Sequence, residues 1–531
     1  MSYDVVIVGG GIAGLTAAAY LSQAKHKVLL IEKEEKVGGL VSSFDYKGFK
    51  LDGGIRSIEN SGIVMPMLRQ LGIDVPFTRS IVSLGIDQDV IQVDTKSSVD
   101  RYSDMLKKHY QEQADDIDHI IKDIKKIMKY MDILYGIDNP LFMDIFKDKK
   151  YLFKTIFPWM FKFMFTVGKV NKLDVPVVQY LDKLTDNKSL NSMISQHFFK
   201  NTPTFFALSY FSLYLDYQYP LEGTGMLIDK IEAFILEQGG TIKTETEVTN
   251  VDVDKHVVQD YEGNTYEYKE LLWAADLNLL YKFVNKNPIS DPKLKEKVST
   301  YQKDIEKLRG GDSIQTVYMT VDMAPSHFKQ ICTGHFFYTP ETKGLAEVEE
   351  RLKDVIASKD KDKIISWLKD YFKYNTYEIS IPAVRNEKLA PKGKTGLIIS
   401  VLMDYDLVKL VESMGWYNEY KEICERFVIE ALDQSIFKGI DEKKIDVFSS
   451  TPLTIEKRTS NKDGAITGWA FTNSHMPIVT SMTGVAKSVL TPMPDIYQAG
   501  QWSYSPAGLP ISIMTGKLAV NRIEKQLKKK G

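Results

Sequence analysis

Cysteine is scarce in this chain, which has only Cys332 and Cys424 among 531 residues. Two cysteines cannot form the disulfide framework of a small secreted protein, and they suit a reducing compartment. The eight histidines show no H-E-x-x-H or comparable ligand spacing. Metal sites usually show ligand residues at such spacings, so we expect no metal site. From the cysteine count we also expect no disulfide framework.

A strong charge imbalance and a long uncharged apolar run are also missing. Lysine and arginine number 68 against 70 aspartate and glutamate, so nothing favours a nucleic-acid partner. The most apolar stretch, residues 151–170, contains three lysines, whereas a spanning helix needs about 20 mostly apolar residues. The apolar run before Gly9 has no basic segment ahead of it, so we expect no secretory signal. These absences point to a cytoplasmic protein, with peripheral membrane attachment left open.

What is present begins at the N-terminus with a nucleotide-binding pattern. A strand-forming run at residues 3–8 leads directly into G-x-G-x-x-G at residues 9–14, and a helix rich in small residues follows. Gly9 allows a tight turn, Gly11 lets the backbone approach a pyrophosphate, and Gly14 lets the helix pack close to the strand. The helix N-terminus would then hold the phosphates through its N–H groups and dipole. The pattern predicts a dinucleotide-binding unit.

The residues that follow favour FAD over a nicotinamide cofactor. A second apolar run, residues 27–31, ends in Glu32, whose carboxylate can accept hydrogen bonds from ribose hydroxyls. Two further glycine pairs come soon after, at residues 38–39 and 53–54. An extended flavin needs the backbone to come close at several points beyond the pyrophosphate, and a nicotinamide unit does not.

Segments throughout the chain resemble one flavoprotein superfamily, which includes phytoene desaturases, carotenoid isomerases, retinol saturases and flavin amine oxidases. Residues 219–248 resemble its middle flavin segment, residues 271–276 the strand that closes that segment, and residues 495–519 its C-terminal flavin segment. Residues 381–394 and 451–469 resemble parts of the desaturase and isomerase branch. The matches follow one another in order along nearly the whole chain.

This resemblance implies the architecture and the cofactor. We expect an α/β fold in which a Rossmann-like FAD-binding domain carries an inserted substrate domain of mixed sheet and helices. The FAD-binding domain would be discontinuous, with residues 1–80, 218–285 and 485–531. The substrate domain would comprise residues 81–217 and 286–484. Boundaries of this kind are uncertain by several residues.

The glycine motif and the resemblance together indicate which residues contact FAD. The expected contacts are Gly9, Gly11, Ile12, Ala13, Gly14, Glu32, Lys33, Gly38, Gly39, Leu40, Gly53, Gly54, Ile55, Arg56, Val248, Ala274, Gly500, Gln501, Gly508, Leu509 and Pro510.

Catalytic residues are harder to identify, and three candidates stand out. Arg56 and Glu59 directly follow a glycine pair expected near the flavin ring. Arg56 could stabilise negative charge on the reduced ring, with a surface or phosphate-side salt bridge as the alternative. Trp469, with Trp502 and Tyr504, could pack against the flavin ring or the substrate, or could only contribute to core packing. The sequence does not choose among these roles.

Two aromatic-rich segments suggest a lipophilic substrate. In residues 151–170 aromatic side chains alternate with lysines, which suits either a helix lying in a membrane interface or a lid on the protein's own core. Residues 197–219 carry many more aromatics, either as ordinary core or as the lining of an apolar tunnel.

The resemblance implies an FAD-dependent enzyme acting on a C=C bond of an isoprenoid, carotenoid or other long-chain lipid, by desaturation, saturation or cis–trans isomerisation. A flavin amine oxidase is the alternative; no cysteine follows Cys424, which excludes covalent flavin attachment through the C-terminal segment. A non-catalytic, lipid-binding flavin fold is a further alternative. The substrate, the reaction direction, the electron partner and the oligomeric state stay open.

Overall fold

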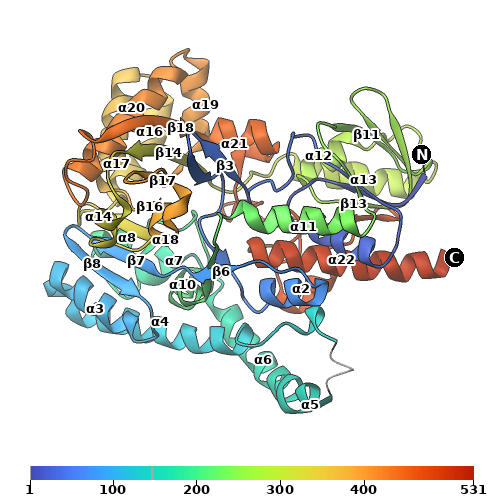
Figure 1. Ribbon diagram of the computed structural model, residues 1–531, viewed down its shortest axis with the longest axis horizontal. Helices are drawn as coiled ribbons and strands as arrows, with labels where there is room; N and C mark the ends of the chain where they lie inside the picture. The colour runs from blue at the N-terminus through green and yellow to red at the C-terminus, as the bar shows by residue number, and fades with distance from the viewer. Residues whose placement is uncertain (1, 145–148, 531) are drawn as a thin grey trace.

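A sheet assembled from three distant parts of the chain forms the centre of one half of the molecule. The computed structural model describes residues 2–144 and 149–530, and Figure 1 shows both termini in this half. Five strands run parallel, and two antiparallel strands extend the sheet from β13. In sheet order these are β10 (Thr241–Lys243), β2 (Val28–Ile31), β1 (Ser2–Val8) and β13 (Thr265–Trp273), with β19 (Ile496–Gln498), β12 (Val257–Asp260) and β11 (Val248–Asp252) beyond β13.

Alternate residues of β1 enter two separate cores, one on each face of this sheet. Val5 and Ile7 pack among α1, α11 and α22, while Val6 and Val8 pack on the opposite side. A parallel sheet covered on both faces explains why β1 reads as a continuous apolar run. The helices of this half are α1 (Ile12–Gln23), α2 (Val64–Leu71), α11 (Gly225–Glu237), α12 (Leu277–Phe283), α13 (Pro292–Ile305) and α22 (Leu509–Lys530).

The packing of α13 differs from the expected domain division, which assigned residues 286–484 to the substrate domain. Val298 and Ile305 of α13 join the same core as Trp273, in the first sheet. Trp469 also lies in that core. The core on the second face of the first sheet therefore contains residues from both of the expected domains.

The other half is built on a second seven-stranded sheet, which is mixed because β7 and β15 run parallel while its other neighbours are antiparallel. A mixed sheet with helices is the predicted architecture of the substrate domain, and the fold class is confirmed. Its strand order is β18 (Lys444–Ser450), β14 (Ser313–Val321), β17 (Thr395–Met403), β16 (Tyr377–Ser380), β15 (His335–Thr339), β7 (Val82–Ile86) and β8 (Asp89–Val93).

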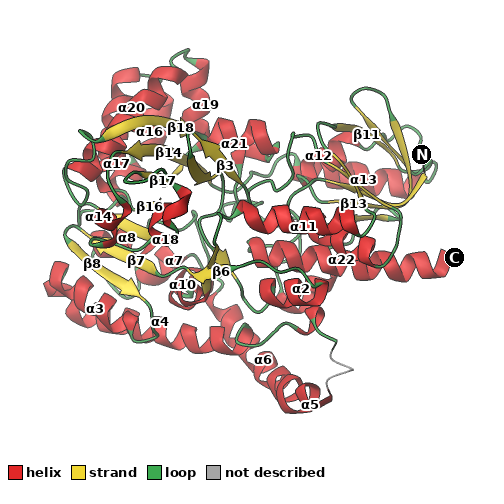
Figure 2. Cartoon of the chain, viewed as in Figure 1, coloured by secondary structure: helices red, strands yellow, loops and turns green. Residues whose placement is uncertain are grey.

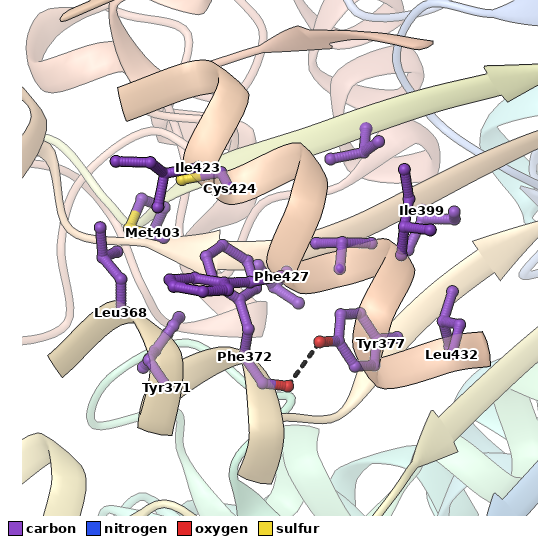
Figure 3. Close-up of a cluster of buried hydrophobic side chains, with 14 of the residues drawn as sticks. Leu368, Tyr371, Phe372, Tyr377, Ile399, Met403, Ile423, Cys424, Phe427 and Leu432 are labelled. Atoms are coloured by element: carbon purple, nitrogen blue, oxygen red, sulfur yellow. Dashed lines mark hydrogen bonds between the residues drawn. The ribbon is translucent and has the colours of Figure 1, made fainter. Parts of the chain in front are cut away.

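Helices cover one face of this second sheet and leave the other face toward the interior of the molecule. Figure 3 shows Phe372 of α17 and Cys424 and Phe427 of α20 packed over Ile399 of β17. Both cysteines are buried and free, and burial raises the pKa of each thiol. The covering helices are α14 (Pro325–Lys329), α15 (Ala346–Glu350), α16 (Leu352–Ser358), α17 (Lys361–Tyr374), α19 (Tyr405–Ser413) and α20 (Tyr417–Asp433).

A helical group packs at the β7–β8 end of the same sheet. It contains α3 (Ser98–His109), α4 (Ala114–Leu134), α7 (Val177–Leu181), α8 (Lys188–Ser195), α9 (Thr204–Leu208) and α10 (Tyr210–Asp216). From it a helical projection extends at the bottom of Figures 1 and 2, formed by α5 (Lys149–Tyr151), a π-helical turn at Leu152–Ile156 and α6 (Phe157–Val170). No helix within the described residues is long and apolar enough to cross a membrane.

Short elements join the two halves. A three-stranded sheet pairs β9 (Tyr217–Pro220) with β5 (Ile58–Glu59) on one side and β6 (Phe77–Arg79) on the other. The remaining pieces are the hairpin β3 (Ser43–Tyr46) and β4 (Phe49–Asp52), and helices α18 (Pro382–Arg385) and α21 (Pro452–Thr459). The small sheet places Glu59 beside Tyr217, where the two halves meet.

Candidate functional site

A cavity of about 1750 Å³ runs between the two halves of the molecule. Pockets for a single small ligand commonly measure roughly 300–1,000 Å³, so this one has room for a dinucleotide and a second molecule. Its walls come from the carboxyl ends of β1, β2 and β13, from the start of α22, and from the second sheet. The edge at the carboxyl ends of parallel strands is the usual ligand site in open α/β sheets.

The glycine-rich turn forms a cradle at one end of this cavity. A Cβ added to Gly11 would meet no atom within 4 Å, so the backbone there faces open space. Gly9 has φ +107°, and a Cβ at Gly14 would lie 2.0 Å from the Gly9 carbonyl oxygen. Gly11 forms the N-cap of α1 without a side-chain hydrogen bond, which leaves the first-turn N–H groups for a ligand. The cradle fits a pyrophosphate held by backbone N–H groups.

Glu32 stands at the end of β2 and lines the same end of the cavity. Its Oε2 accepts a hydrogen bond from the Gly10 N–H at 2.7 Å, and its Oε1 accepts one from the Glu34 N–H at 3.0 Å. A carboxylate has about four acceptor positions, so both oxygens keep capacity for ribose hydroxyls. The backbone thus fixes the orientation of this acid at the cavity.

Apart from Gly14, every residue expected to contact FAD lines this cavity. Gly14 lies behind the turn, where its missing side chain permits the close packing of strand and helix. Gly500 lies close to α1, since a Cβ there would be 3.4 Å from Ala13; it has φ +94°, and its N–H donates to the Thr515 hydroxyl of α22 at 2.9 Å. Three separated parts of the chain therefore converge on one elongated space.

Arg56 is buried at the cavity wall, with 4% of its surface exposed. Its guanidinium donates to the Asp52 carbonyl at 3.1 Å and to the Ser400 hydroxyl at 2.9 Å, and it also bonds the Gly54 carbonyl. Its Nε has no partner in the described chain. Within residues 2–144 and 149–530 no carboxylate forms an ion pair with it, so the expected salt-bridge alternative finds no support. The site keeps a positive charge beside the cavity, suited to an anionic group.

Glu59 lines the cavity beside Tyr217. Burial raises the pKa of its carboxyl to about 7, with a smaller contribution from the negative charge of Asp216. The Ser61 hydroxyl donates to Glu59 Oε1 and opposes this shift in pKa. A carboxyl that titrates near neutral pH can both give and take a proton, which general acid–base catalysis requires.

A second titratable pair at the cavity, His335 and Glu378, was not among the residues predicted from the sequence. His335 Nε2 lies 2.9 Å from Glu378 Oε1, and its Nδ1 lies 3.0 Å from the Ser57 hydroxyl. The imidazole stacks on Tyr217, with ring centroids 5.6 Å apart. Burial lowers the pKa of His335, although Glu378 opposes the shift. The pair comes from neighbouring strands β15 and β16, so no local motif could have revealed it.

The face of the second sheet that points into the cavity follows from strand alternation. Thr316 and Tyr318 of β14 line the cavity, whereas the alternating residues Val317 and Met319 belong to the helix-covered core. The sheet thus supplies polar groups to the site and apolar groups to its own core.

Aromatic side chains dominate the end of the cavity away from the glycine cradle. From the segment 197–219, the lining includes Phe205, Phe206, Tyr210 and Tyr217, while Phe211 and others pack in the core around α4. Both expected roles of this segment therefore occur. Trp159 and Phe163 of α6 complete this end, which we call the aromatic end.

Trp469 is buried behind the wall and does not line the cavity. Its indole N–H donates to the Trp502 carbonyl at 3.2 Å, and the two rings meet edge to face with centroids 5.0 Å apart. Trp502 and Tyr504 do line the cavity. Trp469 thus supports the cavity wall from behind through Trp502 and has no surface on the cavity.

Comparison with known proteins agrees with this geometry. The family model described as flavin-containing amine oxidoreductase matches residues 12–523. The chain is 21% identical to the all-trans-retinol 13,14-reductase of Danio rerio, over 94% of this chain and 82% of that protein. A stretch of 51 residues, 10% of each chain, is 51% identical to the carotenoid 3,4-desaturase of Haloarcula japonica.

The fold also matches solved structures. An oxidoreductase from Methanosarcina mazei has a TM-score of 0.60 with this chain, at 15% identity, covering 99% of this chain and 100% of that one. At this identity the likeness speaks for the fold alone, and it agrees with the predicted Rossmann-like α/β architecture.

Proposed function

The chain belongs to the flavin-containing amine oxidoreductase family and is an FAD-dependent oxidoreductase, and we propose that it acts on a C=C bond of a lipophilic substrate. The observation that carries this proposal is the aromatic end, which continues directly from the glycine cradle. One relative is named for the reduction of retinol and another for the desaturation of a carotenoid, which supports an isoprenoid or other long-chain lipid.

Bound FAD supplies a group that accepts or donates hydride. A desaturation removes a hydride and a proton from the substrate, and a reduction adds both, so the protein must provide a place for the proton. We assign that proton to the Glu59 carboxyl, because its pKa of about 7 allows either protonation state at neutral pH.

The other cavity residues would orient the reactants and exclude water. The positive charge of Arg56, which its hydrogen bonds to neutral oxygens leave in place, would stabilise negative charge that develops beside it during hydride transfer. Phe206, Tyr210 and Phe163 present apolar surface to a long hydrocarbon, whose burial is favourable by roughly 25 cal/mol per Å². These residues give the substrate a binding site without a charged anchor.

Amine oxidation is the second candidate. The family model carries that activity in its description, and the carboxylates of Glu59 and Glu378 at the same cavity could bind an ammonium group. A hydrocarbon substrate and an amine make opposite demands on these acids, because only an amine needs an ionised carboxylate as a binding partner.

Extraction of the purified protein with organic solvent, followed by mass spectrometry, tests the proposal first. We expect FAD together with an unsaturated lipid. Protein with oxidised or reduced flavin should then be mixed without oxygen with retinoids, carotenoids and amines while flavin absorbance is followed.

A polyene product that differs by two hydrogens, or by geometry alone, is the expected outcome and also gives the direction of the reaction. Turnover of amines only would replace the proposal by the second candidate. A bound lipid that never changes the flavin spectrum, in either redox state, would favour a non-catalytic lipid-binding protein. Adding oxygen or quinones to the same assay identifies the electron partner by which of them reoxidises the reduced flavin.

A further inference from the structure

Helix α6 and the turn before it carry the densest group of exposed apolar side chains in the described chain. Of the large apolar residues that are exposed anywhere in it, half lie here, and Phe165 is 75% and Phe153 68% exposed. Soluble surfaces rarely gather such residues in one place without a partner. This surface, called the α6 face below, consists of Phe153, Phe157, Met160, Phe161, Met164 and Phe165.

The spacing of these residues explains why they share one side of the helix. Phe157, Phe161 and Phe165 follow one another at intervals of four residues, which places them one above the other. The rings of Phe157 and Phe161 meet edge to face with centroids 5.3 Å apart. The α6 face is therefore a continuous apolar strip along one side of the helix. Figure 1 shows that this helix projects from the body of the molecule.

The opposite side of α6 belongs to the cavity. Trp159, Phe163 and Val170 line its aromatic end. The Trp159 indole N–H donates to the Ile133 carbonyl of α4 at 2.6 Å, which holds the helix against the body. Helix α6 alone thus separates the cavity from the exposed α6 face.

The charged residues of the helical segment that carries the α6 face are all of one sign. Residues 149–173 contain no aspartate or glutamate. Lysines 150, 154, 162, 169 and 172 are exposed around the apolar strip. Aromatic rings that enter the acyl boundary, with ammonium groups at the level of the phosphates, are the arrangement that binds an amphipathic helix to anionic lipid.

We propose that the α6 face inserts into the headgroup region of a bilayer that contains anionic lipid. The helix lies in the interface and does not span, since lysines interrupt it and its other side is packed on α4. Docking in this way brings the aromatic end of the cavity next to the acyl chains. A lipophilic substrate would then pass from the lipid into the cavity past α6 without crossing water; this route, unlike the docking, rests on the proposed function.

Vesicle flotation of the FAD-loaded protein tests the docking. We expect the wild type to float with vesicles of phosphatidylcholine and phosphatidylglycerol, and at least tenfold less with phosphatidylcholine alone. Phe161→Asp/Phe165→Asp should reduce flotation with the anionic vesicles at least tenfold, and Lys154→Glu/Lys162→Glu should remove the preference for anionic lipid. Leu236→Asp is the matched control, because Leu236 is similarly exposed but lies on α11.

Unchanged flavin absorbance and melting temperature would show that each variant is folded. The proposal is overturned if the wild type floats with neither vesicle, or if Phe161→Asp/Phe165→Asp floats as well as the control. It is also overturned if the wild type is a dimer without lipid and the same variant makes it monomeric without affecting flotation, because the α6 face would then bind a second copy.

The substrate route has its own readout. Once a substrate is known, Phe161→Asp/Phe165→Asp should raise KM for substrate in anionic vesicles and leave KM in detergent micelles unchanged. Equal KM changes in both media would reject the route while leaving the docking intact. Failure of the proposed chemistry would leave the flotation result unaffected, so the two proposals are tested separately.

Discussion

The two ends of the cavity are built in opposite ways. At the cradle, the wall is backbone: Gly11 has no atom near the place where a Cβ would stand, and the N–H groups of α1 face the space. At the aromatic end the wall is side chain, with Phe206, Tyr210 and Phe163 closing it. The first end presents a fixed polar surface and the second an adaptable apolar one.

This difference explains why the cofactor can be predicted from the sequence and the substrate cannot. A pyrophosphate needs backbone groups at fixed positions, and only glycine at particular steps of the chain permits them. A hydrocarbon needs only enough apolar surface, which many residues from many elements can provide. Substitutions at each end should therefore fail in different ways.

The largest effect is expected from Gly11→Val. The Cβ of the new side chain would meet no protein atom within 4 Å and would occupy space assigned to the pyrophosphate, so FAD affinity should fall at least 100-fold while the apoprotein melts as before. Gly14→Ala is the contrasting variant, because its Cβ would lie 2.0 Å from the Gly9 carbonyl oxygen and should lower stability as well. Fluorescence titration with FAD and thermal melting measure both. Normal FAD binding by Gly11→Val would refute the assigned cradle.

Glu59→Gln should affect the chemistry and leave the cofactor in place. Loss of a general acid–base group typically costs about 10²–10⁴ in rate, so kcat should fall at least 100-fold with FAD binding unchanged. The wild-type profile of kcat against pH should contain an ionisation near pH 7 that the variant lacks. If the variant retains that ionisation, His335 becomes the better assignment for the proton.

The same carboxyl should make stability depend on pH. Its pKa is raised from 4.5 to about 7 on folding, so between these values the folded state binds more protons than the unfolded state. The free energy of unfolding should therefore fall as pH rises from 5 to 7, by on the order of 2 kcal/mol from this group. Denaturant melts of wild type and Glu59→Gln at several pH values isolate it. Parallel curves for the two proteins would contradict the shifted pKa.

Glu32→Gln should weaken FAD binding by roughly tenfold, corresponding to one charge-assisted hydrogen bond of about 1.5 kcal/mol. The amide has one acceptor oxygen, which can still serve the Gly10 N–H, whereas the Glu34 N–H loses its acceptor. The glycine turn should therefore keep its shape and the apoprotein should lose only about 1 kcal/mol of stability. Titration of the apoprotein with FAD gives the affinity. Equal affinities for wild type and variant would remove Glu32 from the ribose site.

The smallest effect is expected at the aromatic end, where Phe163→Ala should raise KM for a long lipid by roughly threefold to tenfold and leave FAD affinity unchanged. Truncating one ring removes part of a distributed apolar surface. Phe372→Ala, in the helix-covered core of the second sheet and outside the cavity lining, is the control that should lower stability and spare KM. A loss of FAD from Phe163→Ala would contradict the assignment of the aromatic end to the substrate alone.

Local signals in the sequence predicted much of the FAD end. The glycines of residues 9–14 and the acid at Glu32 act within a few residues of a strand end, so their spacing alone carries the geometry. The FAD cofactor, the family and the fold class are confirmed by the comparisons. The position of α13 was not predictable in this way, because its burial on the first sheet depends on contacts with distant residues such as Trp273.

The sequence by itself therefore determined that this protein binds FAD on a Rossmann-like sheet, because short-range spacing is enough to build a phosphate cradle. Tertiary structure alone decided the rest of the site. It buried Glu59 and so moved its pKa to about 7, and it paired His335 with Glu378 across neighbouring strands. It also gave α6 one side to the cavity and one to solvent. The burial of a side chain, the pairing of strands and the side that a helix turns to the cavity all depend on residues far apart in the chain. A local sequence pattern therefore cannot predict them.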